Sequence, residues 1–439
     1  MLNISKLTKL IKIIIYISNM DIIHDIQYNY LEKQEAIINA LFKYPSGLAE
    51  YMHYRGDPIK FNDASVPNAP LIPHNDHLCC ILNKIANIND KCSNIDIKPL
   101  GPQGKIGVPY IITQDGIEII VKLSSVSNPY SEYMSKPPTS LAKIKNIESC
   151  ITTINLNNIR YIASDEFTNE TLIAYILNYV AAKKNLPPLF VKHYQGIVCN
   201  DKGLNFMEYC NLGPLDKITI KINSLTILQI FTQITVALHM LHNYTVFISG
   251  DLKSGNVFLK SDAILTEYKG IILNAPFTCK IADYGKSSCM LQRKNNISLR
   301  FFTQSHLANL YLKIDPFEPD IEKGKYYYIE KLLNIQLYTR IFYQGAPYYK
   351  TFDLYTVIVS TLTNKEFYYT FFADKKLTSI FWDTIWKTKE DAEDMRYKIY
   401  QYMLEGTGHS INDAINMLKG IPLKCGAVKN IMDAIIKYQ

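Results

Sequence analysis

The stretch Phe247-Ile-Ser-Gly-Asp-Leu-Lys-Ser-Gly-Asn-Val-Phe-Leu259 decides how the fold is interpreted, together with Lys280-Ile-Ala-Asp-Tyr-Gly285 downstream. Each segment sets one aspartate beside an apolar run, and Asp251 is followed at short offsets by Lys253 and Asn256. Phosphoryl transfer from a nucleotide needs such groups: an aspartate to orient the attacking hydroxyl, oxygen ligands for Mg²⁺ and a lysine to neutralise the transferring group. The pattern predicts a phosphotransferase site in these two segments.

The offsets resemble the catalytic loop of the eukaryotic-type Ser/Thr protein kinases. Asp251, Lys253 and Asn256 match the D-L-x-x-x-N portion of that loop, and Asp283-Tyr284-Gly285 matches D-F-G. The resemblance implies that Asp251 orients the substrate hydroxyl, Lys253 contacts the γ-phosphate, and Asn256 and Asp283 hold Mg²⁺. It also implies ATP as the phosphate donor and protein Ser/Thr hydroxyls as acceptors, since tyrosine kinases usually lack a lysine at the position of Lys253.

The chain departs from the family at Ser249-Gly250, where the family has His-Arg. The missing Arg is the usual partner of a phosphorylated activation loop, so we expect that loop phosphorylation is not the on-switch of this non-RD sequence. Residues 261–278 are extra chain, predicted to form a hairpin insertion. Farther on, residues 348–360 resemble the αF helix of the family, from which Asp353 would anchor the backbone of the catalytic loop.

A Gly-rich stretch before a strand predicts the phosphate-binding part of the site. Gly101, Gly104 and Gly107 precede the strand-like run Ile117-Glu-Ile-Ile-Val-Lys122. Glycines let backbone N–H groups approach phosphates, and in the family the strand lysine pairs with the α- and β-phosphates. Gly104 and Gly107 keep the family's G-x-x-G spacing, whereas Gly101 lies one residue too far upstream.

The family resemblance also implies an αC helix and a hinge. Residues 164–180 open with N-capping types and continue with helical periodicity, so Glu170 is the predicted partner of Lys122, with Glu166 as the alternative. Glu208 would begin the hinge, and Cys210 would offer backbone groups to adenine.

The predicted fold class is α+β: a two-lobed protein-kinase-like fold with an antiparallel-sheet N-lobe, an αC helix and a mainly helical C-lobe. Residues 1–95 are assigned to an N-terminal accessory segment, 96–211 to the N-lobe and hinge, and 212–439 to the C-lobe. Within the C-lobe, residues 224–242 are predicted to form a long apolar helix capped by Ser224. Residues 189–193 and 197–199 are predicted to form a strand pair.

Composition favours a globular protein with a sizeable core and argues against a dedicated nucleic-acid surface. Of 439 residues, 48% are hydrophobic, and the net charge of +7 is dispersed without a Lys/Arg block. The nine cysteines lack a paired metal spacing, which indicates reduced intracellular thiols, and His74 and His77 near Cys79-Cys80 lack the second half of a metal site. The apolar run at residues 7–18 is too short to span a bilayer and lacks a signal-cleavage site. We therefore expect a cytoplasmic protein, with Met20 as an alternative start.

Two other functions stay open. A kinase-like small-molecule phosphotransferase of the aminoglycoside/choline type would fit Gly250-Asp251, although that family usually has His where Lys253 stands. A pseudokinase that binds nucleotide without transfer would fit the irregular glycine spacing, but Lys122, Asp251, Asn256 and Asp283 are all retained. The divergent motifs, insertions and AT-rich residue usage resemble kinases of large double-stranded DNA viruses, for which host cytoplasm or virion would be the location.

Overall fold

The computed structural model describes residues 22–43, 76–86, 95–101, 107–125, 151–156, 159–164, 166–199, 202–245, 247–249, 251–292, 298–303, 346–405, 423–424 and 426–439. The chain separates into two compact units. The first consists of residues 1–37, 69–126 and 192–209, and the second of residues 38–68, 127–191 and 210–439. The structure is α+β, as predicted. The assignment of residues 1–95, 96–211 and 212–439 as accessory segment, N-lobe with hinge, and C-lobe stays a prediction.

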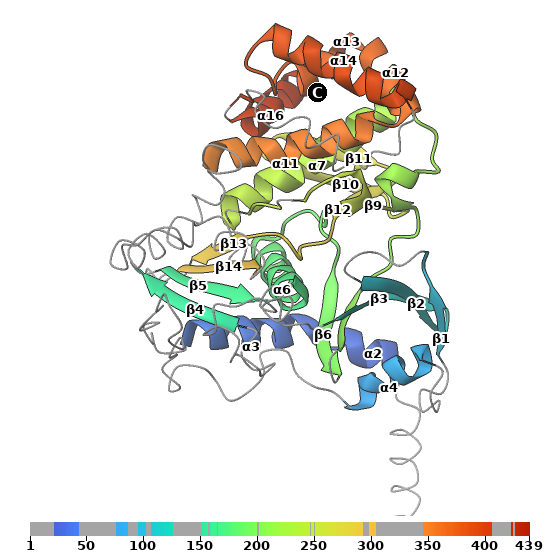
Figure 1. Ribbon diagram of the computed structural model, residues 1–439, viewed down its shortest axis with the longest axis vertical. Helices are drawn as coiled ribbons and strands as arrows, with labels where there is room; N and C mark the ends of the chain where they lie inside the picture. The colour runs from blue at the N-terminus through green and yellow to red at the C-terminus, as the bar shows by residue number, and fades with distance from the viewer. Residues whose placement is uncertain are drawn as a thin grey trace, which may run out of the picture. The chain divides into compact units, whose positions relative to one another are not determined.

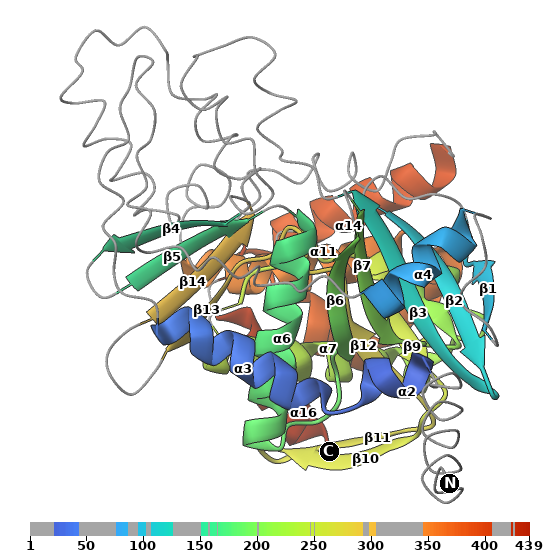
Figure 2. The same ribbon diagram turned by 90° about the horizontal axis from the view of Figure 1, so that it is seen from below.

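The first unit is built on a five-stranded antiparallel sheet. Its order is β1-β2-β3-β7-β6, which can be followed in Figure 2. Neighbouring strands pair without a crossover except where β7 inserts between β3 and β6. The strands are β1 (Asp96–Pro99), β2 (Gly107–Gln114), β3 (Ile117–Ser125), β6 (His193–Cys199) and β7 (Lys202–Glu208).

Short helices from the predicted accessory segment pack on this sheet. They are α2 (Ile22–Gln27), α4 (Asp76–Ile85) and the start of α3 (Tyr30–Lys43). Ile23 of α2 and Ile81 of α4 are fully buried in one core with Ile119, Val121 and Phe206 of the sheet. A buried hydrogen bond from Ile23 N to Gln114 Oε1 (3.1 Å) ties α2 to β2. These helices therefore complete the core of the first unit by burying apolar surface.

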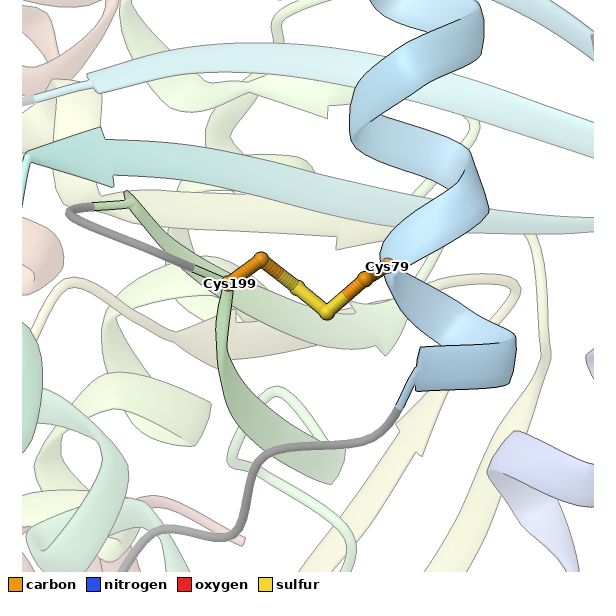
Figure 3. The surroundings of a disulfide bond; sticks show 2 residues. All are labelled: Cys79 and Cys199. Carbon is orange, nitrogen blue, oxygen red and sulfur yellow. A yellow bond between two sulfur atoms is a disulfide. The ribbon is translucent and has the colours of Figure 1, made fainter.

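A disulfide bond joins Cys79 of α4 to Cys199 at the end of β6, across 120 residues of sequence (Figure 3). The expectation that all thiols are reduced is therefore wrong. The error arose because a disulfide needs two cysteines close in space, and the sequence gives no spacing rule for a pair so far apart. The strand pair expected at 189–193 and 197–199 is also wrong, because β6 is a single strand that pairs with β7.

The second unit combines small sheets with most of the helices (Figure 1). β8 (Gly213–Pro214), β9 (Val257–Lys260) and β12 (Thr278–Ile281) form one antiparallel sheet, and β10 (Ile264–Tyr268) pairs with β11 (Ile271–Ala275) in the predicted hairpin insertion. A further sheet has the order β13-β14-β5-β4, with β14 parallel to β5. Its strands are β4 (Ile151–Leu156), β5 (Ile159–Ser164), β13 (Cys289–Gln292) and β14 (Ser298–Thr303).

The helical part of the second unit is organised around α7 (Ser224–Tyr244), which is contacted by α11 (Ala346–Leu362), α12 (Lys365–Ala373) and α16 (Ala427–Tyr438). Phe231 of α7 is fully buried and meets Phe371 and Phe381 edge to face. The N-cap is Asn223, whose side chain accepts a hydrogen bond from Thr226 N (2.9 Å), and not Ser224 as predicted. The remaining elements are α6 (Glu166–Lys184), η4 (Leu215–Lys217), η5 (Ser254–Asn256), α13 (Lys375–Leu377), η6 (Thr378–Trp382) and α14 (Lys389–Glu405).

Among the described residues, α7 is the one helix whose length and apolar composition would allow it to cross a membrane. About three quarters of its apolar window, 72%, is buried within the protein. A buried core helix passes the same test, so this feature is weak support for a membrane span.

Candidate active site

The predicted catalytic segments of the second unit meet beside the β9–β12 ladder. Val257 of β9 pairs with Ile281 of β12, so the residue before β9 and the residues after β12 lie at the same end of the ladder. A hydrogen bond from Ala282 N to Asn256 O (3.0 Å) closes this end. The two predicted Mg²⁺ ligands, Asn256 and Asp283, therefore come from adjacent backbone segments although they are 27 positions apart in the sequence.

The helix α11 holds the predicted catalytic loop from one side. The carboxylate of Asp353 is buried and accepts a hydrogen bond from Ser249 N (2.7 Å). One heptad farther along α11, Ser360 Oγ accepts a hydrogen bond from Ser254 N (2.8 Å). Residues seven apart lie on one face of a helix, so a single face of α11 fixes the loop on both sides of Asp251. The predicted anchoring role of Asp353 is confirmed.

Asp251 lies at the centre of a cluster of polar groups. Lys253 Nζ is 3.3 Å from both carboxylate oxygens of Asp251. Asn256 Nδ2 donates a hydrogen bond to Asp251 O (2.8 Å), which leaves the amide oxygen of Asn256 available as a ligand. A residue that the sequence prediction missed, Lys286, also contacts Asp251, with Nζ 3.2 Å from Oδ2. The only signal for it in the sequence is a cation directly after Asp283-Tyr-Gly285.

Asp283 has a left-handed backbone, with φ at +61°. Non-glycine residues adopt this conformation rarely, and such strain persists where the surrounding contacts over-determine it. The next residue, Tyr284, supplies some of those contacts because its ring is buried and meets Phe247 edge to face. The hydroxyl of Tyr284 donates a hydrogen bond to the carbonyl of Ile281. Tyrosine therefore fits in the interior here, at the position where the D-F-G motif has phenylalanine.

A second residue that the sequence prediction missed, Asn169 of α6, binds the turn after Asp283. Its fully buried amide donates to Ser287 O (2.8 Å) and Gly285 O (3.0 Å), with Tyr284 O at 3.4 Å. Gly285 also lies close to the start of α6, since a Cβ added there would be 3.6 Å from Glu166 O. The α6 helix thus holds the backbone of the Asp283 turn directly.

The two glutamates proposed as the lysine partner differ in burial. Glu170 is 2% exposed, whereas Glu166, the first residue of α6, is intermediate. Burial of a carboxylate favours a specific partner over a solvated surface role. The pairing of Glu170 with Lys122 would join two separate units and stays a prediction.

The predicted nucleotide-binding residues of the first unit lie on β1, β2 and β3 or next to them. Lys122 is on β3, opposite Asn205 of β7. Gly107 begins β2, where an added Cβ would lie 2.7 Å from Leu123 O, so only glycine fits. Gly101 has φ at +99°, which also favours glycine. Gly104 lies outside the described residues.

The two residues predicted to form the hinge, Glu208 and Cys210, are engaged in local hydrogen bonds. Glu208 ends β7, and its Oε1 accepts a hydrogen bond from Lys192 N (2.7 Å). Burial, followed by the charge of Glu208, raises the pKa of the Tyr30 phenol. Cys210 belongs to the second unit, is buried, and accepts a hydrogen bond at its carbonyl from Gly213 N (3.0 Å). Adenine binding by these residues stays a prediction.

The chemistry of the donors fits Mg²⁺. The cation prefers carboxylate and amide oxygens and retains several waters, so the two oxygen donors from Asn256 and Asp283 suffice for a nucleotide-bound ion. In the described part of the chain, no group of three or more His, Cys, Asp or Glu residues could hold a metal by itself.

No protein-family model matches the chain. The chain is similar to a protein named "putative serine/threonine-protein kinase" from Acanthamoeba polyphaga mimivirus, at 24% identity over 56% of this chain. The similarity covers 43% of that relative, so the chain spans less than half of its length. The resemblance to divergent Ser/Thr kinases of large DNA viruses is therefore confirmed.

Proposed function

We propose that this protein is an ATP-dependent protein kinase that phosphorylates serine and threonine hydroxyls of proteins. The observation that carries the proposal is the cluster around Asp251, in which Lys253, Asn256 and the segment after β12 meet on a loop held by α11. Catalysis of phosphoryl transfer consists mainly of positioning and electrostatic stabilisation, and these groups supply both.

Asp251 would orient the substrate hydroxyl and accept its proton as the oxygen attacks the γ-phosphorus. Lys253 would remain protonated and neutralise charge on the transferring group. Asn256 and Asp283 would hold Mg²⁺, which supplies charge neutralisation on the nucleotide phosphates when bound. The backbone N–H groups of Ser249 and Ser254 donate hydrogen bonds to Asp353 and Ser360 of α11. The loop is thus held on both sides of Asp251, which favours this role because catalytic groups require a fixed geometry.

The sheet of the first unit would form the nucleotide-binding lobe, with Lys122 on the α- and β-phosphates, and α6 would act as the αC helix. The partners would be ATP and protein substrates, without nucleic acid. The cytoplasm of a host cell or a virion would be the location.

The small-molecule phosphotransferase is the second candidate, and Gly250-Asp251 is the feature that favours it. The two enzymes differ in their acceptor. Transfer of labelled phosphate from ATP to small amines or alcohols, and never to protein, would favour this candidate.

The test of the proposal compares the wild type with Asp251→Asn in the presence of labelled ATP, Mg²⁺ and a generic basic protein. We expect transfer by the wild type and a loss on the order of 10²–10⁴-fold in Asp251→Asn, the range for a general base. Asp433→Asn on α16 is the matched control, because it makes the same chemical change at an exposed position. If the wild type bound nucleotide but transferred no phosphate, the kinase proposal would be overturned and the pseudokinase would be the remaining function.

A further inference from the structure

Two lysines from different segments contact the carboxylate of Asp251. Lys253 belongs to the catalytic loop, and Lys286 follows the Asp283 turn; their Nζ atoms lie 3.3 and 3.2 Å from the carboxylate oxygens. The side chain of Lys286 is 42% exposed, that of Lys253 is 25% exposed, and that of Asp251 is 17% exposed. Lys286 is therefore close to the reacting group and also has room to change partner.

The backbone on both sides of Lys286 is fixed. Ser287 N donates to Tyr284 O (2.9 Å), and Ser287 O accepts from the buried amide of Asn169. Ser288 and Ile248 exchange two hydrogen bonds of 2.8 Å, which fasten this segment to the strand-like residues before the catalytic loop. The position of Lys286 near Asp251 thus follows from the backbone contacts of the segment.

The charges of the cluster favour a bound anion. One carboxylate balances one ammonium group, so Asp251, Lys253 and Lys286 together carry one net positive charge, and the charge of the nearby Asp283 would be neutralised by the Mg²⁺ that it is proposed to hold. A cation beside a catalytic carboxylate stabilises negative charge that arrives or develops there, and a phosphoryl group carries such charge on three oxygens.

We propose that Lys286 is a further catalytic residue that contacts the γ-phosphoryl group of ATP during transfer; this inference rests on the proposed function. When the phosphoryl group is bound, Lys286 moves from Asp251 Oδ2 to a phosphoryl oxygen and leaves Oδ2 open to the substrate hydroxyl. The hydroxyl oxygen then bonds to the γ-phosphorus, the bond from that phosphorus to the β–γ bridging oxygen breaks, and ADP leaves. The hydroxyl proton passes to Asp251 and on to water, while both lysines stay protonated.

The first measurement is of binding and does not depend on turnover. Calorimetry in Mg²⁺ gives the affinity for a non-hydrolysable ATP analogue and for ADP, in the wild type, Lys286→Met and Lys286→Arg. We expect Lys286→Met to weaken binding of the ATP analogue relative to ADP, so that the ratio of analogue affinity to ADP affinity falls by roughly tenfold or more, as for loss of one hydrogen bond to a charged group. Lys286→Arg should restore part of this ratio. Lys429→Met at an exposed site on α16 is the matched control.

The second measurement is kinetic. We expect Lys286→Met to lower kcat on the order of 10²-fold, the size typical of the loss of one preorganised charge-stabilising donor, with KM for the protein substrate unchanged. An unchanged affinity ratio in Lys286→Met would overturn the inference. An unchanged or increased kcat would also overturn it, because Lys286 would then only pair with Asp251 in the absence of substrate. The proposed function has its own test, because it fails if the wild type shows no Asp251-dependent transfer. In that case the affinity ratio still decides whether Lys286 contacts the γ-phosphate.

Discussion

The contact between Asn169 and the Asp283 turn gives the sharpest prediction about how this site is held. The change is Asn169→Asp, with Asn169→Leu as a second variant of similar size. Either substitution removes the amide N–H donors that bind Gly285 O (3.0 Å) and Ser287 O (2.8 Å). In Asn169→Asp the new carboxylate would lie in a fully buried position against carbonyl oxygens.

The magnitude follows from the two shorter hydrogen bonds. Each contributes about 1 kcal/mol net, and leaving a buried carbonyl without a donor costs about 1–3 kcal/mol. We expect the turn to lose roughly 2–4 kcal/mol of stability. A loss of about 3 kcal/mol changes a local equilibrium on the order of 10²-fold, so the left-handed conformation of Asp283 would no longer be held.

The assay combines urea unfolding with the Mg²⁺ concentration that gives half-maximal phosphoryl transfer. We expect both variants to require more Mg²⁺ and to lose kcat at least tenfold, on the basis of that shift. Asn274→Asp, on the exposed side of β11, is the matched control and should change neither quantity. If the variants lost the expected stability but kept kcat and the Mg²⁺ requirement, Asn169 would have a structural role alone, and the positioning argument would be refuted.

Two further predictions concern the cysteines. Cys199→Ser removes the cross-link to Cys79, so urea unfolding should show that the first unit loses about 2–4 kcal/mol of its free energy of unfolding. The chain-entropy model gives ~5 kcal/mol for a cross-link of this sequence separation. An unchanged urea midpoint would contradict this prediction. Burial raises the pKa of the Cys279 thiol above its ordinary 9.0, so the folded protein keeps the thiol neutral and should resist iodoacetamide at pH 8, as peptide mass spectrometry can measure. Rapid labelling of Cys279 in the folded protein would contradict this prediction, because it would show that the thiol is accessible. The same shift makes the stability of the fold depend on pH: the contribution of the neutral Cys279 thiol is fully present below pH about 9 and is lost as the pH rises further.

The sequence determined the central loop of the site. Lys253 and Asn256 follow Asp251 at two and five positions, so a short backbone segment fixes which side chains can act together. Asp353 could be predicted as the anchor because the apolar pattern around it resembles a helix of known role, and its hydrogen bond to Ser249 N confirms this. The hairpin at residues 261–278 could be predicted because these residues are extra chain between Asn256 and Asp283 compared with the kinase motifs, and the pairing of β10 with β11 confirms it.

The tertiary structure alone decided the contacts between distant segments. Lys286 reaches Asp251 across 35 residues, Asn169 reaches Gly285 across 116, and Cys79 reaches Cys199 across 120. The physical reason is that periodicity and local propensity report which face of an element is buried, but not which distant element covers it. Packing of whole elements decides that, and here it added to the predicted loop a second lysine at Asp251 and a buried amide that holds the turn of Asp283.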